Sequence, residues 1–141
     1  MKVLRNVLAV VAGLVVGGAV NMALVIASPL VIPPPAGVDV SDPRSLSASL
    51  HLFEPKHFVF PFLAHALGTL AGALVAFFVA ASHRPVFAYV IGAFFLAGGI
   101  AAALMIPAPA WFVILDLAAA YLPMAWVGTL LGRRFVGGPK P

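Results

Sequence analysis

Residues 58–81 read FVFPFLAHALGTLAGALVAFFVAA and contain no lysine, arginine, aspartate or glutamate. A bilayer is crossed by about 20 consecutive helical residues that are mostly apolar. Because lipid offers the backbone no hydrogen-bond partner, such a run must satisfy its own N–H and C=O groups, and a helix does so. This stretch therefore predicts a transmembrane helix.

Three further apolar runs are long enough to cross a bilayer: 4–27, 86–106 and 110–131. Prolines, which lack the N–H that continues a helix, stand beside these runs at Pro29, Pro85, Pro107 and Pro109. We expect an all-α, polytopic membrane protein in which residues 1–141 form one four-helix transmembrane bundle, each span helical throughout. Pro123, inside the fourth run, predicts a kink.

The composition excludes several classes of protein. Of the residues, 63% are hydrophobic and 9% are charged, against roughly 45–50% and 25% in an ordinary soluble domain. So few polar side chains cannot cover a water-facing surface or keep a chain disordered. The scattered bases form no patch that could follow nucleic-acid phosphates. The chain has no cysteine, which excludes disulfides and thiolate chemistry.

Lysine and arginine residues predict the orientation of the spans. Six of the eight lie at the start of the first run, between the second and third, or after the fourth: Lys2, Arg5, Arg84, Arg133, Arg134 and Lys140. The other two, Arg44 and Lys56, lie in the loop 28–57. An excess of bases marks the cytoplasmic side, so we expect both termini inside and this loop outside. We also expect the first run to remain as a span, because it is longer than the roughly 7–15 residues of a signal-peptide core; cleavage after Ala27 is the alternative.

The outer loop 28–57 contains a predicted surface helix. Asp42-Pro43 is typical of a helix N-cap followed by proline at the first helical position. Leu46, Leu50 and Phe53 follow at helical spacing with polar residues between them, which predicts a short amphipathic helix on the outer membrane surface. It is either a lid without activity of its own or part of a site, and we favour the lid.

Small residues recur at every fourth position in the spans. In the first span the series is Ala9, Gly13 and Gly17. In the second span it is Ala64, Gly68, Gly72, Ala76 and Ala80. Membrane helices associate through close backbone contact at small residues. These series predict either a compact bundle or a homo-oligomer, and spacing does not separate the two.

Three polar residues from three spans are expected at one depth. Asn21, His65 and Asp116 each lie six or seven residues from the outer end of their span, which is about 9–10 Å of helix. An ionisable residue in the hydrocarbon is costly and is a functional-site hypothesis by default. Thr69 is one helical turn below His65 on the same face. The layer is interpreted either as a small polar chamber that opens outward or as a buried network that only fixes the register of the helices.

A second polar cluster is expected at the outer interface: His51, Glu54, Lys56 and His57. Two histidines and a carboxylate can bind zinc, but the spacing matches no metal motif and Pro55 interrupts it. We therefore expect headgroup contacts and local ion pairs there, and neither a metal nor another cofactor.

The segment 51–73, HLFEPKHFVFPFLAHALGTLAGA, resembles that of small four-span bacterial inner-membrane proteins of unassigned function. The resemblance implies a multi-pass location in the bacterial inner membrane. It supplies no catalytic or ligand-binding residues.

For function, the sequence favours a small membrane protein without evident catalytic machinery that acts as an accessory or scaffold through helix packing. Its expected partners are membrane lipids, other membrane-protein subunits or a second copy of itself, and not nucleic acid. The alternative is a protein that binds or transports a small molecule or lipid through Asn21, His65 and Asp116, with or without proton coupling. An intramembrane enzyme ranks lowest, because no nucleophile, metal motif or second membrane carboxylate accompanies Asp116.

Overall fold

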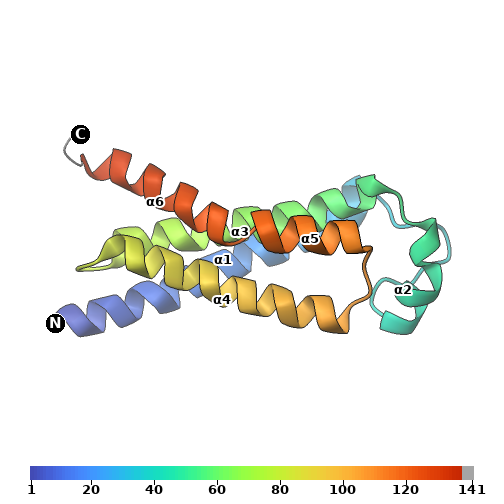
Figure 1. Cartoon of the computed structure of the whole chain (residues 1–141), viewed down its shortest axis with the longest axis horizontal. Helices are drawn as coiled ribbons and strands as arrows, with labels where there is room; N and C mark the ends of the chain where they lie inside the picture. Colours follow the sequence, from blue (N-terminus) through green and yellow to red (C-terminus); the bar gives the residue numbers. More distant parts are fainter. Residues whose placement is uncertain (138–141) are drawn as a thin grey trace.

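The computed structural model describes residues 1–137, and these residues form helices without any strand. Lys140, one of the bases used to orient the spans, lies outside the described residues. Along the chain the elements are α1 (Lys2–Val31), α2 (Pro43–Ser49), η1 (Leu50–Leu52), η2 (Pro55–Phe58), α3 (Val59–Val79), α4 (Arg84–Met105), α5 (Ala110–Ala119) and α6 (Leu122–Val136). α1 begins and α6 ends at one end of the elongated molecule, and α2 lies at the other (Figure 1). We call the end with α2 the outer end, after the orientation that the lysines and arginines predict.

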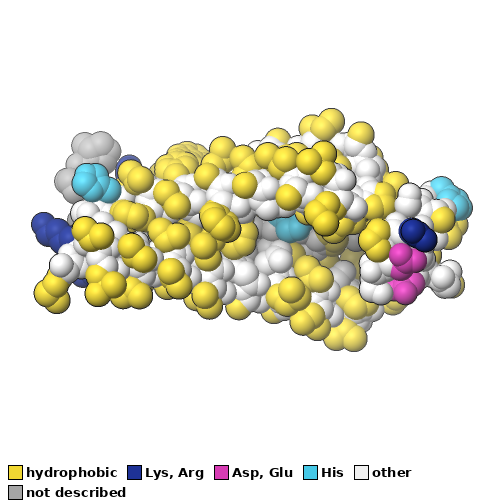
Figure 2. Space-filling view, turned by 90° about the horizontal axis from the view of Figure 1, so that it is seen from below, with side chains coloured by type: hydrophobic (Ala, Val, Ile, Leu, Met, Phe, Trp, Pro, Cys, Tyr) yellow, Lys and Arg dark blue, Asp and Glu magenta, His cyan; other side chains and the backbone are white. Residues whose placement is uncertain are grey.

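Four helical stretches are long and apolar enough to cross a membrane: Lys2–Val31, Pro55–Val79, Arg84–Met105 and Ala110–Val136. The predicted all-α class with four spans is therefore confirmed. Apolar side chains cover the length of the bundle, between two ends that carry charged groups (Figure 2).

The first span is longer than the sequence predicts. The prediction ends it at Ala27, before Pro29, but α1 continues through Pro29 to Val31. A proline costs one backbone hydrogen bond and crowds the carbonyl four residues before it. Pro29 nevertheless lies within the last turn of α1, which closes after it because the Ile32 N–H donates to the Ser28 carbonyl at 2.8 Å. The outer loop therefore begins at residue 32 rather than 28.

α1 packs against α3 through glycines. A Cβ atom built on Gly13 would lie 2.8 Å from the Gly72 carbonyl oxygen, and one on Gly72 would lie 2.6 Å from the Gly13 oxygen. Gly17 and Gly68 are related in the same way, at 2.7 and 2.9 Å. The two backbones thus meet where no larger residue fits, and the small-residue faces of the first two spans face each other. We call this contact the α1–α3 seam.

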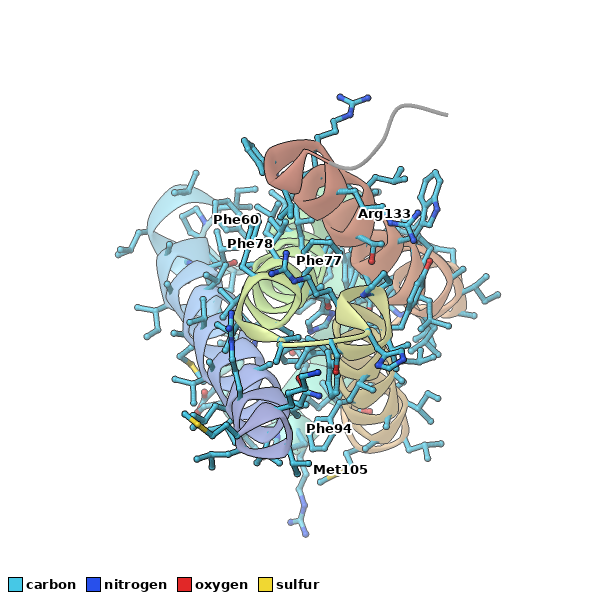
Figure 3. All side chains as sticks on the ribbon, turned by 90° about the vertical axis from the view of Figure 1, so that its left-hand side faces the viewer. Phe60, Phe77, Phe78, Phe94, Met105 and Arg133 are labelled. Atoms are coloured by element: carbon cyan, nitrogen blue, oxygen red, sulfur yellow. The ribbon has the colours of Figure 1, made fainter. Side chains whose placement is uncertain are left out.

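α3 occupies the middle of the bundle, with α1 on one side and α4 and α6 on the others (Figure 3). Small residues again allow close approach, since a Cβ on Gly128 of α6 would lie 3.1 Å from the Cβ of Ala73. Phe77 of α3 is buried, whereas Phe94 of α4 is 61% exposed (Figure 3). Many large apolar side chains therefore lie on the outside of the bundle, where lipid would meet them, while small residues and a few large ones such as Phe77 fill its interior.

The fourth span consists of two helices. α5 ends at Ala119 and α6 begins at Leu122, so the prediction of an unbroken helix over 110–131 is wrong, and Pro123 does more than kink it. Pro123 has no N–H to donate to the carbonyl of Ala119, and its ring would collide with that carbonyl in a continuous helix. The chain therefore turns at Ala120 and Tyr121, and α6 leaves α5 at an angle (Figure 1).

The turn between α3 and α4 is held by the start of α1. The Asn6 side chain accepts a hydrogen bond from the Ala81 N–H at 2.9 Å and donates to the Ser82 hydroxyl at 3.1 Å. Arg5 Nε donates to the Val79 carbonyl at 2.7 Å. These bonds satisfy polar groups that the end of α3 leaves free. They fix three spans to one another at the end opposite α2.

The predicted helix of the outer loop is present as α2. The Asp42 side chain accepts hydrogen bonds from the N–H groups of Arg44 and Ser45, at 3.1 and 3.3 Å, and Pro43 occupies the first helical position. The Asp42-Pro43 cap is therefore confirmed. A short 3-10 turn, η1, continues α2 to Leu52. α2 lies across the outer end of the bundle (Figure 1).

Candidate binding cavity

His65 of α3 and Asp116 of α5 form a hydrogen-bonded pair between two spans. The Nδ1 atom of His65 lies 2.8 Å from one carboxylate oxygen of Asp116 and 2.9 Å from the other. The Asp116 side chain is 7% exposed, whereas the His65 side chain is 28% exposed. Counting along the helices brings the two residues to one depth, and the structure brings them into contact. The pair joins a buried acid to a base that stays partly accessible.

Tyr121 is the third member of this group, and sequence reasoning missed its role. Its hydroxyl donates to Asp116 Oδ2 at 2.9 Å, and its ring stacks on that of His65 with 5.7 Å between centroids. Gly99 of α4 makes room, because a Cβ there would overlap the phenol. The available signal was Pro123, since the helix break turns Tyr121 back toward Asp116. We call His65, Asp116 and Tyr121 the polar triad.

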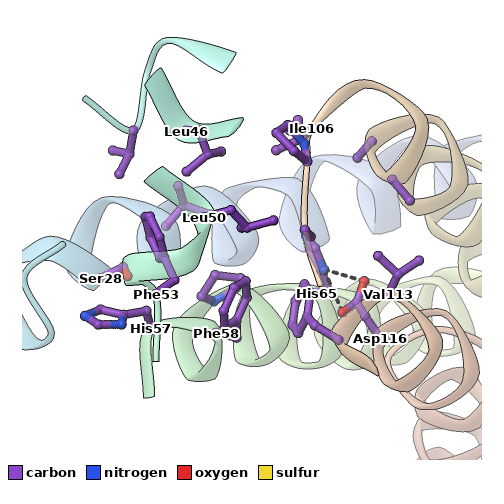
Figure 4. Close-up of a pocket in the computed structure, with 18 of the residues that line it drawn as sticks. Ser28, Leu46, Leu50, Phe53, His57, Phe58, His65, Ile106, Val113 and Asp116 are labelled. Carbon is purple, nitrogen blue, oxygen red and sulfur yellow. Dashed lines mark hydrogen bonds and ion pairs between the residues drawn. The ribbon is translucent and has the colours of Figure 1, made fainter. Parts of the chain in front are cut away.

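A cavity of about 400 Å³ adjoins the polar triad in the outer half of the bundle. Residues of α1, α2, α3, α4 and α5 all contribute to its wall (Figure 4). His65 and Asp116 lie at one side of it, and η1 and the end of α2 lie at the other (Figure 4). Binding sites for small molecules have volumes of roughly 300–1,000 Å³, so this cavity is large enough to hold one.

The wall of the cavity is almost entirely apolar. Aromatic residues such as Phe58 and Phe112 line it together with aliphatic ones. Leu46, Leu50 and Phe53, the predicted apolar face of the outer helix, also line it (Figure 4). α2 and η1 therefore turn their apolar face toward the cavity, as a lid does.

Asn21 and Thr69 do not join the polar triad. Asn21 lies against Gly68 at the α1–α3 seam, and its Oδ1 atom is buried without a hydrogen-bond partner among the described residues. Thr69 is fully buried, and within residues 1–137 its hydroxyl has no partner either. Counting residues fixes the depth of a side chain but not its direction around the helix axis. Asn21 therefore shares the depth of Asp116 without a hydrogen bond to it.

The predicted outer-interface cluster is a set of local contacts. Lys56 and Glu54 form an exposed ion pair at 3.1 Å, and His57 Nδ1 accepts a hydrogen bond from the Glu54 N–H at 2.9 Å. His51 is exposed on η1. In the part of the chain that the structure describes, no three histidine, cysteine or acidic residues stand close enough to hold a metal ion. His57 thus helps to fix the start of η2.

Comparison of the chain with protein families, with curated proteins and with solved structures finds no match. The class of the protein therefore follows from its own fold and site. It is a multi-pass helical membrane protein with a largely apolar cavity and a buried polar triad beside it.

Proposed function

We propose that this protein binds a small, mostly apolar molecule in the outer half of the bundle, with the polar part of that molecule directed to His65. The observation that carries the proposal is the cavity of about 400 Å³ that reaches both His65 and Asp116. Ligand sites are typically apolar clefts with a few converging polar groups that orient the ligand, and this cavity has that composition.

The cavity favours binding over a purely architectural role. A scaffold that acts only through packed helices gains nothing from such a space, because the atoms around a void lose packing contacts and the fold loses stability. The α1–α3 seam shows that this chain can bring helices into backbone contact where its residues are small. Near the cavity the chain instead places Phe58, Phe112, His65 and Asp116 around an open space.

The lid gives the proposed site a defined outer boundary. Leu46, Leu50 and Phe53 would shield an apolar ligand from water at the outer end, and burying that ligand is favourable because its apolar surface leaves water. The cap at Asp42 holds the first turn of α2 in place. α2 carries few contacts to the transmembrane helices, so it is the element that would move when a ligand enters.

The test uses two substitutions on one helix. Ala103 lines the cavity, whereas Ala101, two residues earlier on α4, is exposed and does not. Wild type, Ala103→Trp and Ala101→Trp would be purified in native nanodiscs, and the molecules released from each would be identified by mass spectrometry. We expect a small apolar molecule that accompanies wild type and Ala101→Trp but is depleted in Ala103→Trp, because the indole fills the cavity.

Two results would argue against the proposal. If the same molecules accompany all three proteins in equal amounts, the cavity is not where they bind. If wild type retains no small molecule but retains another membrane protein that both variants also retain, the accessory role predicted from the sequence is the better explanation.

A further inference from the structure

The cavity offers very few polar groups to a ligand. At the side of the polar triad, both carboxyl oxygens of Asp116 are already hydrogen-bonded to His65 Nδ1, and Oδ2 also accepts from the Tyr121 hydroxyl. Ser28 and His57 lie near Phe53, away from the polar triad (Figure 4). His65 lines the cavity, and within residues 1–137 its side chain is hydrogen-bonded only through Nδ1, to Asp116, which leaves the second ring nitrogen, Nε2, without a partner. It is the polar atom of the triad that remains for a ligand.

The total charge of His65 and Asp116 decides whether Nε2 is a hydrogen-bond donor or an acceptor. An unbalanced charge is expensive in an apolar membrane interior, so the pair of His65 and Asp116 is most stable when its total charge is zero. Two arrangements meet this condition: an imidazolium beside a carboxylate, or a neutral imidazole whose Nδ1 accepts from a protonated Asp116. In both arrangements Nε2 carries a hydrogen. Wherever the shared proton lies, Nε2 of the neutral pair is therefore a hydrogen-bond donor on a residue that lines the cavity.

From this geometry we infer the ligand class: an uncharged apolar molecule whose polar end is an acceptor oxygen without a hydrogen of its own, such as a ketone or an ester. This inference rests on the proposed function. A carbonyl oxygen accepts the Nε2–H bond and leaves no polar group unpaired. An alcohol also accepts that bond, but its own O–H then has no acceptor in an apolar wall, and an unpaired buried donor is costly. An ammonium group has no lone pair to offer and brings a charge into the cavity.

The experiment compares four probes that share a chain of equal length: methyl nonyl ketone, undecanol, undecylamine and undecane. Each would be titrated into nanodiscs that contain the full-length protein, with empty nanodiscs to correct for partition into lipid. We expect the ketone to bind about 3–10-fold more tightly than the alcohol and the alkane, the ratio that corresponds to one net hydrogen bond. The amine should bind most weakly.

A spectroscopic readout identifies the hydrogen bond itself. The infrared band of an isotope-labelled ketone carbonyl moves to lower frequency when the oxygen accepts a hydrogen bond. We expect the moved band with wild type and not with the double variant His65→Phe/Asp116→Leu, in which apolar groups replace the whole pair, an exchange that buried ion pairs often tolerate. If the double variant does not fold, the side-chain NMR signals of isotope-labelled histidine in wild type give the same test. The His65 Nε2–H signal should shift with the ketone and not with undecane.

Each outcome has a separate meaning. If all four probes bind equally and the carbonyl band does not move, the ligand class is wrong while the proposed binding function stands. If the amine binds best, the pair carries a net negative charge and the inference is overturned. If no probe binds more than to empty nanodiscs, the proposed function itself fails for apolar molecules of this size.

Discussion

At the scale of residues, the polar triad shows what depth counting along a sequence can and cannot find. His65 and Asp116 each lie six or seven residues from the outer end of their span, which predicts one depth for both, and in the structure they are in contact. Asn21 has the same depth but lies against Gly68. Tyr121 is five residues beyond Asp116, about 7.5 Å deeper on a straight helix. It reaches Asp116 because the helix breaks before Pro123. The proline itself is visible in the sequence, but the contact between Tyr121 and Asp116 that results from it is not.

Tyr121→Phe tests the polar triad with the loss of a single oxygen. The substitution keeps the ring that stacks on His65 but removes the hydroxyl that donates to Oδ2 of the buried Asp116. We expect a loss of about 1–3 kcal/mol of stability, because a buried acceptor loses a partner. Thermal unfolding in detergent measures the change. Tyr89→Phe is the matched control, since Tyr89 is exposed; equal losses in the two variants would mean that the Tyr121 hydroxyl stabilises nothing.

The adjacent glycines of α4 give a second test at this scale. A Cβ on Gly99 would overlap the Tyr121 phenol, whereas a Cβ on Gly98 meets nothing within 4 Å. We expect Gly99→Ala to destabilise the protein by about 1–3 kcal/mol, as overpacking does, and to displace Tyr121. Gly98→Ala should be neutral or slightly stabilising, because alanine is the better helix former. The melting temperatures of the two variants measure these changes. If Gly99→Ala melts at the same temperature as wild type, Tyr121 does not lie against Gly99.

At the scale of elements, the sequence predicts the faces of helices better than their partners. The fourth-residue repeats identified the packing faces of the first two spans, and the structure places those faces together at the α1–α3 seam. Spacing alone left a homo-oligomer equally open, because a face of small residues fits a copy of itself as well as a neighbour. The Asp42 cap was predictable for a different reason: its hydrogen bonds are local and need no tertiary information.

Gly72→Leu tests the α1–α3 seam. A leucine would collide with the Gly13 carbonyl and force α1 away from α3, so we expect the stability to fall by about 1–3 kcal/mol. Gly18 lies on the same helix as Gly13 but faces open space, and Gly18→Leu is the control that should change stability little. Thermal unfolding of both variants in the same detergent is the measurement. Similar melting temperatures would show that the seam is not a close contact.

The cap of α2 can be removed without touching the transmembrane helices. Asp42→Ala deletes the acceptor for two backbone N–H groups at the start of the helix, a change that typically costs about 1 kcal/mol of helix stability. We expect faster hydrogen exchange in 43–52 and an unchanged global melting temperature, because α2 is a separate local unit. Ser47→Ala, at an exposed position inside α2, should leave exchange unchanged. A fall in the global melting temperature would show instead that the lid is part of the bundle core.

At the scale of the whole molecule, hydropathy and charge were sufficient for the membrane fold but not for the cavity. The four spans follow from runs of apolar residues, which lipid requires of any crossing helix. A cavity wall and a lipid-facing surface use the same side chains, so Phe58 and Phe112 read as ordinary span residues until the neighbouring helices are in place. Pro123 predicts a bend in the fourth span, but the direction of that bend, which brings Tyr121 to Asp116, is recorded by no local pattern.

The orientation of the bundle in its membrane is the last prediction. Lys2, Arg5 and Arg84 lie at the end where α1 begins, opposite α2, and an excess of bases marks the cytoplasmic side; we therefore expect α2 to face outward. Because the chain has no cysteine, Ser47→Cys on α2 and Val136→Cys at the end of α6 would each provide a single thiol at an exposed position. A membrane-impermeant maleimide should label residue 47 in intact bacterial cells, and residue 136 only after the membrane is permeabilised. The reverse labelling pattern would show that the predicted orientation is wrong and that the lid and the cavity lie on the cytoplasmic side.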